Sequence, residues 1–245
     1  MLKTILPLFL AVTVLASFSW SQSVTPKSRS GLKTNLDLPF DAGGEDSQQE
    51  DAPELIVFYG AAYEASNVVF CLDESLTMRN GGRFDIEKRE VRRAISELNP
   101  DAMFGVLFYG GQVTSFSRQL MKATTANKQA AMGFINSRAE NLGTCLGNSV
   151  AQALQMLHRS EARFQAVILV SDGTPTRCPF ARLNGCGEKQ AVCNEVLAQI
   201  TAANARRMPV HCILVGNADR CNGLPTQFMR AVSGLSGGSF RHVPQ

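Results

Sequence analysis

The stretch that decides the fold is residues 68–77, which read Val-Val-Phe-Cys-Leu-Asp-Glu-Ser-Leu-Thr. Apolar side chains come first, and acidic and hydroxyl side chains follow directly. A continuous apolar run is typical of a strand that is buried on both faces, as in a parallel sheet. Open α/β sheets bind ligands just beyond the carboxyl ends of such strands. The stretch therefore predicts a central strand that ends in a polar site.

Comparable apolar runs recur along the chain and alternate with segments of helical period. The expected strands are residues 68–72, 103–109, 166–170, 210–215 and 239–243, and the expected helices are residues 85–98, 146–158, 188–205 and 228–235. In the first helix, the apolar stripe leaves Glu87 outside it. The alternation predicts an α/β fold, with a mostly parallel sheet covered by helices on both faces.

The N-terminal segment, residues 1–21, has the layout of a secretory signal peptide. Lys3 is its one charged residue, residues 5–16 are apolar, and small residues follow. The apolar run is shorter than the roughly 20 residues that a membrane span needs, although an uncleaved anchor stays open as an alternative. We expect a secreted or periplasmic protein with no membrane span in its mature chain.

A flexible acidic linker is predicted at residues 22–54, where seven acidic residues outnumber three basic ones and no apolar period is sustained. One folded domain is then expected at residues 55–245. The net charge of the whole chain is +3, which is too weak to imply a nucleic acid partner.

The seven cysteines of an exported chain favour disulfides, and the odd number leaves at least one unpaired. Cys71 and Cys212 lie within strand-like runs and are expected in the core, while Cys145 is expected to pack at a helix start. The best candidates for pairing are Cys178, Cys186, Cys193 and Cys221. A zinc site is the alternative, but the chain has no C-x-x-C pair.

The polar site combines carboxylates with hydroxyls. Asp73, Ser75 and Thr77 occupy alternate positions, so their side chains converge if the loop is extended. Asp172 follows the strand at residues 166–170 in the same way. Such all-oxygen ligands suit Mg²⁺ or Mn²⁺. The alternative is that each residue only caps the next helix.

Three pieces of the chain, in this order, resemble the von Willebrand factor type A domain of exported, bacterial-type proteins. The metal-ion-dependent adhesion site of that family has Asp-x-Ser-x-Ser, then a Thr, then an Asp. The pieces that carry the resemblance are residues 68–78, the helix start Gly143-Thr144-Cys145-Leu146, and residues 168–175. In addition, residues 236–240 resemble the family's last turn.

The resemblance implies a doubly wound, six-stranded sheet of order 3-2-1-4-5-6 over residues 55–245. It also implies a binding module rather than an enzyme, in which Mg²⁺ or Mn²⁺ recognises a protein ligand. An Asp or Glu carboxylate of that ligand would complete the metal's coordination shell. The metal ligands it implies are Asp73, Ser75, Thr77, Thr144 and Asp172.

Three residues depart from the family pattern. Thr77 replaces the usual Ser and adds a methyl group that stiffens χ1. Leu76 stands where many members have Gly, which restricts the loop. Glu74 adds a carboxylate that either deepens the negative potential or faces solvent.

Two other functions compete with metal-dependent binding. The haloacid dehalogenase-like phosphatases have Asp-x-Asp-x-Thr after a strand, but Ser75 replaces their second Asp, and its hydroxyl is a poor general acid. A purely structural, metal-free module is the other alternative. If binding is the function, Arg177, Arg182 and Lys189 on the segment 176–189 would attract an acidic partner.

Overall fold

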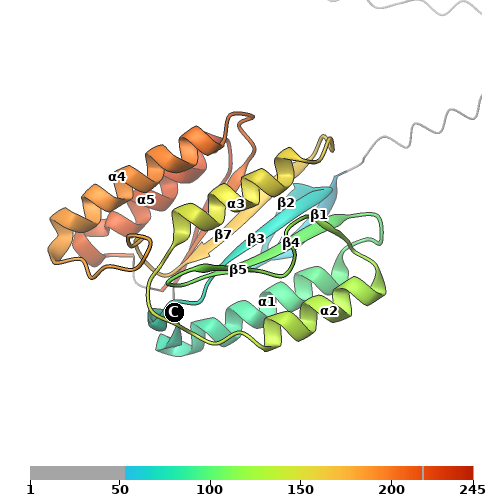
Figure 1. The fold of residues 1–245 in the computed structure, drawn as a ribbon, viewed down its shortest axis with the longest axis horizontal. Coiled ribbons are helices and arrows are strands. Elements are labelled where there is room, and N and C mark those ends of the chain that lie inside the picture. Colours follow the sequence, from blue (N-terminus) through green and yellow to red (C-terminus); the bar gives the residue numbers. More distant parts are fainter. Residues whose placement is uncertain (1–52, 217, 245) are drawn as a thin grey trace, which may run out of the picture. The chain divides into compact units, whose positions relative to one another are not determined.

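The computed structural model describes residues 53–216 and 218–244. The predicted signal peptide and nearly all of the predicted linker lie outside these residues. The described part forms a central sheet with helices on both faces (Figure 1), as the sequence predicts. Within these two ranges, no helix is both long enough and apolar enough to cross a membrane.

The order of the main sheet is β5-β4-β3-β7-β8-β9. In chain order these six strands run 3-2-1-4-5-6, so the predicted order is confirmed. Only the edge strand β5 is antiparallel to its neighbour along this path. The strands are β3 (Asn67–Asp73), β4 (Met103–Tyr109), β5 (Val113–Ser115), β7 (Gln165–Ser171), β8 (Val210–Val215) and β9 (Phe240–Val243).

Four short strands, β1, β2, β5 and β6, lie outside the ranges predicted from the sequence, although the resemblance implied a sixth strand in the place of β5. β6 (Met121–Lys122) pairs with β4 and makes the sheet seven-stranded. β1 (Glu54–Phe58) and β2 (Ala61–Ala65) form a separate hairpin. Its turn has positive φ at both Tyr59 and Gly60, which suits a tight two-residue connection but lacks the usual Asn-Gly signal.

Two layers of helices cover the sheet. α1 (Arg83–Glu97) and α2 (Thr125–Asn136) lie on one side, and α3 (Leu146–His158), α4 (Gly185–Ala203) and α5 (Arg220–Ser236) lie on the other (Figure 1). The strands are buried on both faces, so alternate residues of β3 enter different cores. Phe70 and Leu72 pack in the core that α1 and α2 share, whereas Val69 and Cys71 pack in the core of the other three helices.

The helix boundaries differ from the predicted ones except at α3. α2 was not predicted, and its apolar pattern is weak because only Ala131 and Ile135 are buried. The prediction that Glu87 lies outside the buried stripe of α1 was wrong, since its side chain is completely buried. Apolar periodicity could not reveal this, because Glu87 is buried by a polar contact with the end of β3.

Two disulfides are present, Cys145–Cys178 and Cys186–Cys221. The predicted pairing of Cys178, Cys186 and Cys221 is confirmed, but Cys193 is a buried free thiol and Cys145 is bonded instead. Cys193 faces the core from α4, whereas the loop after β7 returns to the start of α3 and brings Cys178 to Cys145. Cys71 and Cys212 are buried thiols, as predicted.

Candidate functional site

The site begins at the carboxyl end of β3, where Asp73 is completely buried. Its Oδ1 accepts the backbone N–H of Ser75 at 2.8 Å, and its Oδ2 accepts the hydroxyl of Ser171 at 2.7 Å. Ser171 is the last residue of the neighbouring strand β7. Asp73 therefore joins the ends of two adjacent parallel strands.

The remaining hydroxyls of this loop connect Asp73 to Asp172. Ser75 Oγ lies 3.1 Å from Thr77 Oγ1, and the Thr77 hydroxyl donates to Asp172 Oδ1 at 2.8 Å. Leu76, between them, is 40% exposed and takes no part in these hydrogen bonds. The extra bulk at position 76 thus leaves the hydroxyls of Ser75 and Thr77 facing Asp172.

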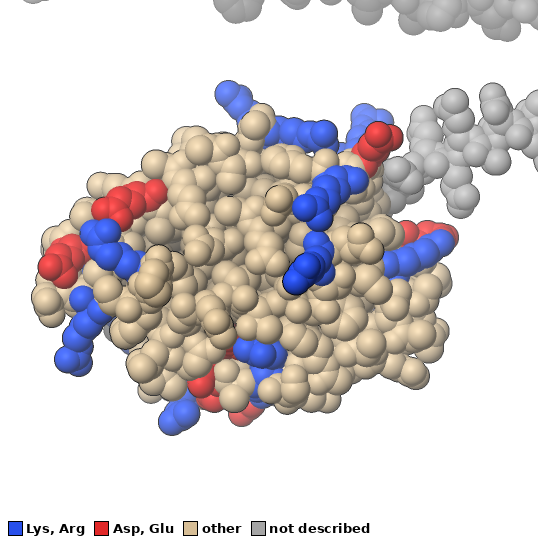
Figure 2. Space-filling view, in the orientation of Figure 1, with Lys and Arg blue, Asp and Glu red and all other residues tan. Residues whose placement is uncertain are grey.

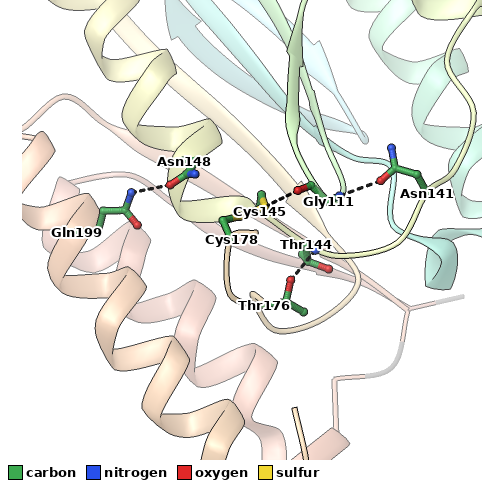
Figure 3. Close-up of a disulfide and its surroundings, with 8 residues drawn as sticks. All are labelled: Gly111, Asn141, Thr144, Cys145, Asn148, Thr176, Cys178 and Gln199. Carbon is green, nitrogen blue, oxygen red and sulfur yellow. Dashed lines mark hydrogen bonds between the residues drawn. A yellow bond between two sulfur atoms is a disulfide. The ribbon is translucent and has the colours of Figure 1, made fainter. Parts of the chain in front are cut away.

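Thr144 is held at the start of α3 by the loop that follows β7. Its backbone N–H donates to Thr176 Oγ1 at 2.8 Å, and its carbonyl accepts the N–H of Thr176 at 3.0 Å. The Cys145–Cys178 disulfide joins the same two segments covalently, as Figure 3 shows. The backbone of Thr144 is therefore fixed from two directions.

The hydroxyls of Ser75 and Thr144 do not serve as helix caps. Ser75 precedes the 3₁₀ helix η1 (Leu76–Gly82) without a side-chain capping bond, and Cys145, not Thr144, is the N-cap of α3. Within the described part of the chain, the Thr144 hydroxyl has no hydrogen-bond partner. The capping alternative thus fails for these two residues.

A buried arginine is part of the site. Arg83, the first residue of α1, forms an ion pair of 2.8 Å between its Nη1 and Asp172 Oδ2. Its guanidinium lies against Gly216 at the end of β8, where a Cβ would stand 2.4 Å from Arg83 Cζ. Gly216 also has a φ of +88°, so both its conformation and its lack of a side chain make room for Arg83.

The buried charges of the site do not balance. Three carboxylates are almost completely buried, those of Asp73, Glu87 and Asp172, against one guanidinium, that of Arg83; this is a formal surplus of two negative charges. Burial, and then the charge of Asp172, raises the pKa of Asp73 to about 7. Burial and the charge of Asp73 raise the pKa of Glu87 well above its usual value. The site therefore favours an additional positive charge.

Glu74 does not add to this surplus. It is completely buried, and its two oxygens accept hydrogen bonds of 2.8–2.9 Å from Arg138 and 2.7 Å from Asn141. Asn141 also accepts the N–H of Gly111 (Figure 3). Glu74 thus neither faces solvent nor adds an unpaired charge to the site, the two expectations from the sequence. Instead it holds the loop that leads to Thr144.

A cavity of about 370 Å³ opens beside the site. Thr77, Thr144 and Asp172 line it together with apolar and basic side chains. Arg182 and Lys189, predicted to attract an acidic partner, both line this cavity, as does Arg220. Arg177 does not, because it pairs with Glu195 of α4 at 2.9 Å.

The structure thus brings the five predicted residues to one edge of the sheet. Hydrogen bonds join Asp73, Ser75, Thr77 and Asp172, and Thr144 shares a cavity with Thr77 and Asp172. The polar residues that surround them were not predicted from the sequence; they are Arg83, Glu87, Arg138, Asn141, Ser171 and Thr176. Only Ser171 had a sequence signal, because it directly precedes Asp172.

Residues 68–174 match the family model of the von Willebrand factor type A domain. The chain contains a von Willebrand factor type A domain. Similar curated proteins include inter-alpha-trypsin inhibitor heavy chain 4 of Mus musculus, 25% identical over 46% of this chain and 12% of that protein. Heavy chain H1 of Sus scrofa is 27% identical over 45% of this chain and 13% of that protein.

Several solved structures share the fold. A von Willebrand factor type A protein from Catenulispora acidiphila has a TM-score of 0.58 and 18% identity, covering 76% of this chain and 40% of that one. The corresponding domain of the type V pili tip protein Mfa5 from Porphyromonas gingivalis has a TM-score of 0.57 and 13% identity, covering 72% and 89%. The pilus adhesin SpaC from Lactobacillus rhamnosus GG has a TM-score of 0.57 and 16% identity, covering 73% and 28%. At these identities the likeness concerns the fold alone.

Proposed function

We propose that this type A domain is an exported, non-enzymatic binding module, which holds Mg²⁺ or Mn²⁺ and recognises a carboxylate of a protein partner through the metal. The observation that carries the proposal is the cluster of three buried carboxyl groups around one guanidinium, beside hydroxyls that cap no helix. Asp73, Ser75, Thr77, Thr144 and Asp172 would hold the ion, some of them through water. A divalent cation would neutralise the surplus, and the hydroxyls would supply neutral oxygen ligands.

The phosphatase alternative is not favoured. The position of its second catalytic Asp is Ser75, whose hydroxyl lies within hydrogen-bond distance of Thr77. The zinc alternative is weakened, because four of the cysteines are bonded in disulfides and cannot act as thiolate ligands. Of the two solved pilus proteins named above, one structure is titled the vWF domain of a pili tip protein and the other a pilus adhesin, which supports a role in binding.

Export is part of the proposal. Two disulfides favour an oxidising compartment, so we place the mature protein in the periplasm or outside the cell. Residues 1–21 would be the signal peptide, residues 22–54 the linker, and residues 55–245 the type A domain.

Calorimetry with Mg²⁺ and Mn²⁺ tests the metal site. The mature chain should bind one ion of either metal, and Asp73→Ala should abolish that binding because it removes a buried ligand charge. Equal binding by the variant would exclude this site.

The relaxation of solvent water protons then tests for an open coordination position. Bound Mn²⁺ that keeps an exchangeable water should enhance that relaxation, and acetate at high concentration should reduce the enhancement by displacing the water. An enhancement that acetate does not change would argue against recognition of a carboxylate.

The Cys145–Cys178 disulfide should affect both stability and metal binding. Replacing both cysteines by Ser should lower the free energy of unfolding by about 2–4 kcal/mol, because the bond closes a long loop. It should also weaken Mg²⁺ binding, because Thr144 and Thr176 lose their covalent clamp. Urea unfolding and calorimetry measure the two effects.

The Cys186–Cys221 disulfide is a matched control, because its sequence separation of 35 is close to the 33 of the first. Replacing both of its cysteines should cost similar stability but leave Mg²⁺ affinity nearly unchanged, since this bond joins α4 to α5 and not the metal-ligand loops. Equal losses of Mg²⁺ affinity in both double variants would contradict a specific role for the first bond.

A further inference from the structure

Exposed apolar side chains gather around the proposed metal site. Five large apolar side chains of the described residues are strongly exposed, and three of them, Leu76, Leu142 and Phe180, belong to the loops that carry the predicted ligands. Leu76 adjoins Thr77, Leu142 precedes Gly143-Thr144, and Phe180 follows Asp172 on the loop after β7. We call these three residues the apolar collar.

The members of the collar are neighbours in space. Ser75 and Asn141 form a parallel bridge, which places Leu76 beside Leu142. The Cβ of Phe180 lies 3.2 Å from where a Cβ would stand on Gly143. Phe180 also lines the cavity that Thr77, Thr144 and Asp172 share. Phe180 therefore connects the collar to the cavity beside the metal site.

Basic residues occupy another part of the same cavity. Arg182, Lys189 and Arg220 line it, and among residues 53–216 and 218–244 none of the three forms an ion pair. We call them the basic cleft. Cys186 precedes Lys189 on α4 and Cys221 directly follows Arg220 on α5, so the Cys186–Cys221 disulfide ties these two helices together next to both basic residues. Its position fixes how far apart the basic side chains are anchored.

Another broad surface lacks exposed apolar side chains. Most of the face in Figure 2 is uncharged, and α3 itself contains no Asp, Glu, Lys or Arg, although Arg118 and Arg159 line a cavity together with its side chains. Its exposed residues are amides such as Asn148 and Gln155. A surface of this kind is ordinary for a soluble protein, whereas apolar side chains clustered beside unpaired cations mark an interaction site.

Resting on the proposed function, we infer that the partner is an exposed acidic loop of a protein, in which bulky aliphatic or aromatic side chains flank the carboxylate that binds the metal. The apolar side chains would pack on the collar and remove it from water. Additional carboxylates would lie in the basic cleft, whose charge is complementary to theirs. A uronic acid oligosaccharide offers carboxylates but no bulky apolar side chains, so it would leave the collar uncovered.

Three capped nonapeptides with a central Asp test the inference, with the mature chain saturated with Mg²⁺ and binding followed by fluorescence anisotropy. The first has Leu and Phe beside the Asp and two Glu further out; the second has Ser in place of Leu and Phe; the third has Gln in place of Glu. We expect the second peptide to bind about tenfold more weakly than the first, because its Ser side chains bury no apolar surface on the collar. The third should bind more weakly at low salt only, since screening removes the contribution of the cleft.

Protein variants assign the two effects to their surfaces. Leu142→Ser with Phe180→Ser should make the first and second peptides bind alike, whereas Leu235→Ser should change nothing. Leu235 is a matched control, because it is 59% exposed, as is Leu142, but lies near the end of α5. Arg182→Gln with Lys189→Gln should remove the difference between the first and third peptides, and Arg177→Gln, which breaks a pair with Glu195, should not.

The possible failures are distinguishable. Three results would overturn the inference and leave the metal site standing. These are equal binding of the first two peptides, tighter binding of a uronic acid oligosaccharide, and no peptide binding by a chain that calorimetry shows to hold Mg²⁺. Absence of Mg²⁺ binding, or peptide binding that persists unchanged in EDTA, would remove the proposed function and the inference with it.

Discussion

Replacing Asp73 by Asn should make the metal-free protein more stable, even though this residue is central to metal binding. The Asp73 carboxylate is completely buried and repelled by Asp172. The amide keeps the shape, and its oxygen can still accept the N–H of Ser75. In EDTA at pH 8 we expect the free energy of unfolding to rise by about 1 kcal/mol or more. Urea unfolding gives the value.

The sign of the effect depends on pH in a defined way. Folding raises the pKa of Asp73 from 3.8 to about 7, so the ionised carboxylate destabilises the folded state. This cost is absent below pH 3.8, where the group is protonated in both states, and it is complete above pH 7. The gain from Asp73→Asn should therefore appear between these values and level off above pH 7.

Asp85→Asn provides the control for charge alone. Asp85 also lies near the start of α1, but its side chain is 84% exposed and pairs only with Lys88 at 3.5 Å. Its replacement should change stability by less than about 0.5 kcal/mol. Mg²⁺ at a hundred times its dissociation constant should stabilise wild type and Asp85→Asn by about 2.7 kcal/mol, and Asp73→Asn hardly at all. A loss of stability in metal-free Asp73→Asn would contradict an uncompensated buried charge.

The central strands could be predicted from the sequence because their surroundings are uniform. A strand such as β3 is buried on both faces, so all seven of its residues are buried, and its sequence is a continuous apolar run up to Asp73. The order of the sheet followed from the resemblance to type A domains, not from the pattern. The short strands and α2 escaped prediction because they bury few residues and give no clear period.

The ligand candidates could be predicted because they follow strands, and the residues that support them could not. Arg83 and Glu87 lie on a helix whose apolar period gives no sign that its charged residues turn inward. They are buried because α1 begins at the site, where Arg83 donates to Asp172 and Glu87 accepts the backbone N–H of Asp73. Cys145 was misjudged for the same reason, since its partner Cys178 comes near only when the loop after β7 folds back.

Replacing Arg83 by Met should destabilise the metal-free protein by about 3–5 kcal/mol, the largest change that we expect from one substitution. Among the described residues Arg83 is the one cation that pairs with Asp172, and its loss leaves that buried carboxylate without a counter-charge. Met retains much of the apolar stem, so the change is mainly in charge. Mg²⁺ should restore part of the lost stability, because it would place positive charge beside the same carboxylate. Denaturation in EDTA and in Mg²⁺ measures both quantities.

Arg138→Met separates this effect from the general cost of breaking a buried ion pair. Arg138 pairs with Glu74 at 2.8 Å, and Glu74 is as completely buried as the carboxylates of the site. Its replacement should also destabilise the protein strongly, but Mg²⁺ should then stabilise it no more than it stabilises wild type, because the orphaned carboxylate is not a metal ligand. In Arg83→Met the increment from Mg²⁺ should exceed that of wild type, since a competing cation has been removed from Asp172. Equal increments in the two variants would show that Arg83 and the metal do not act on the same charge.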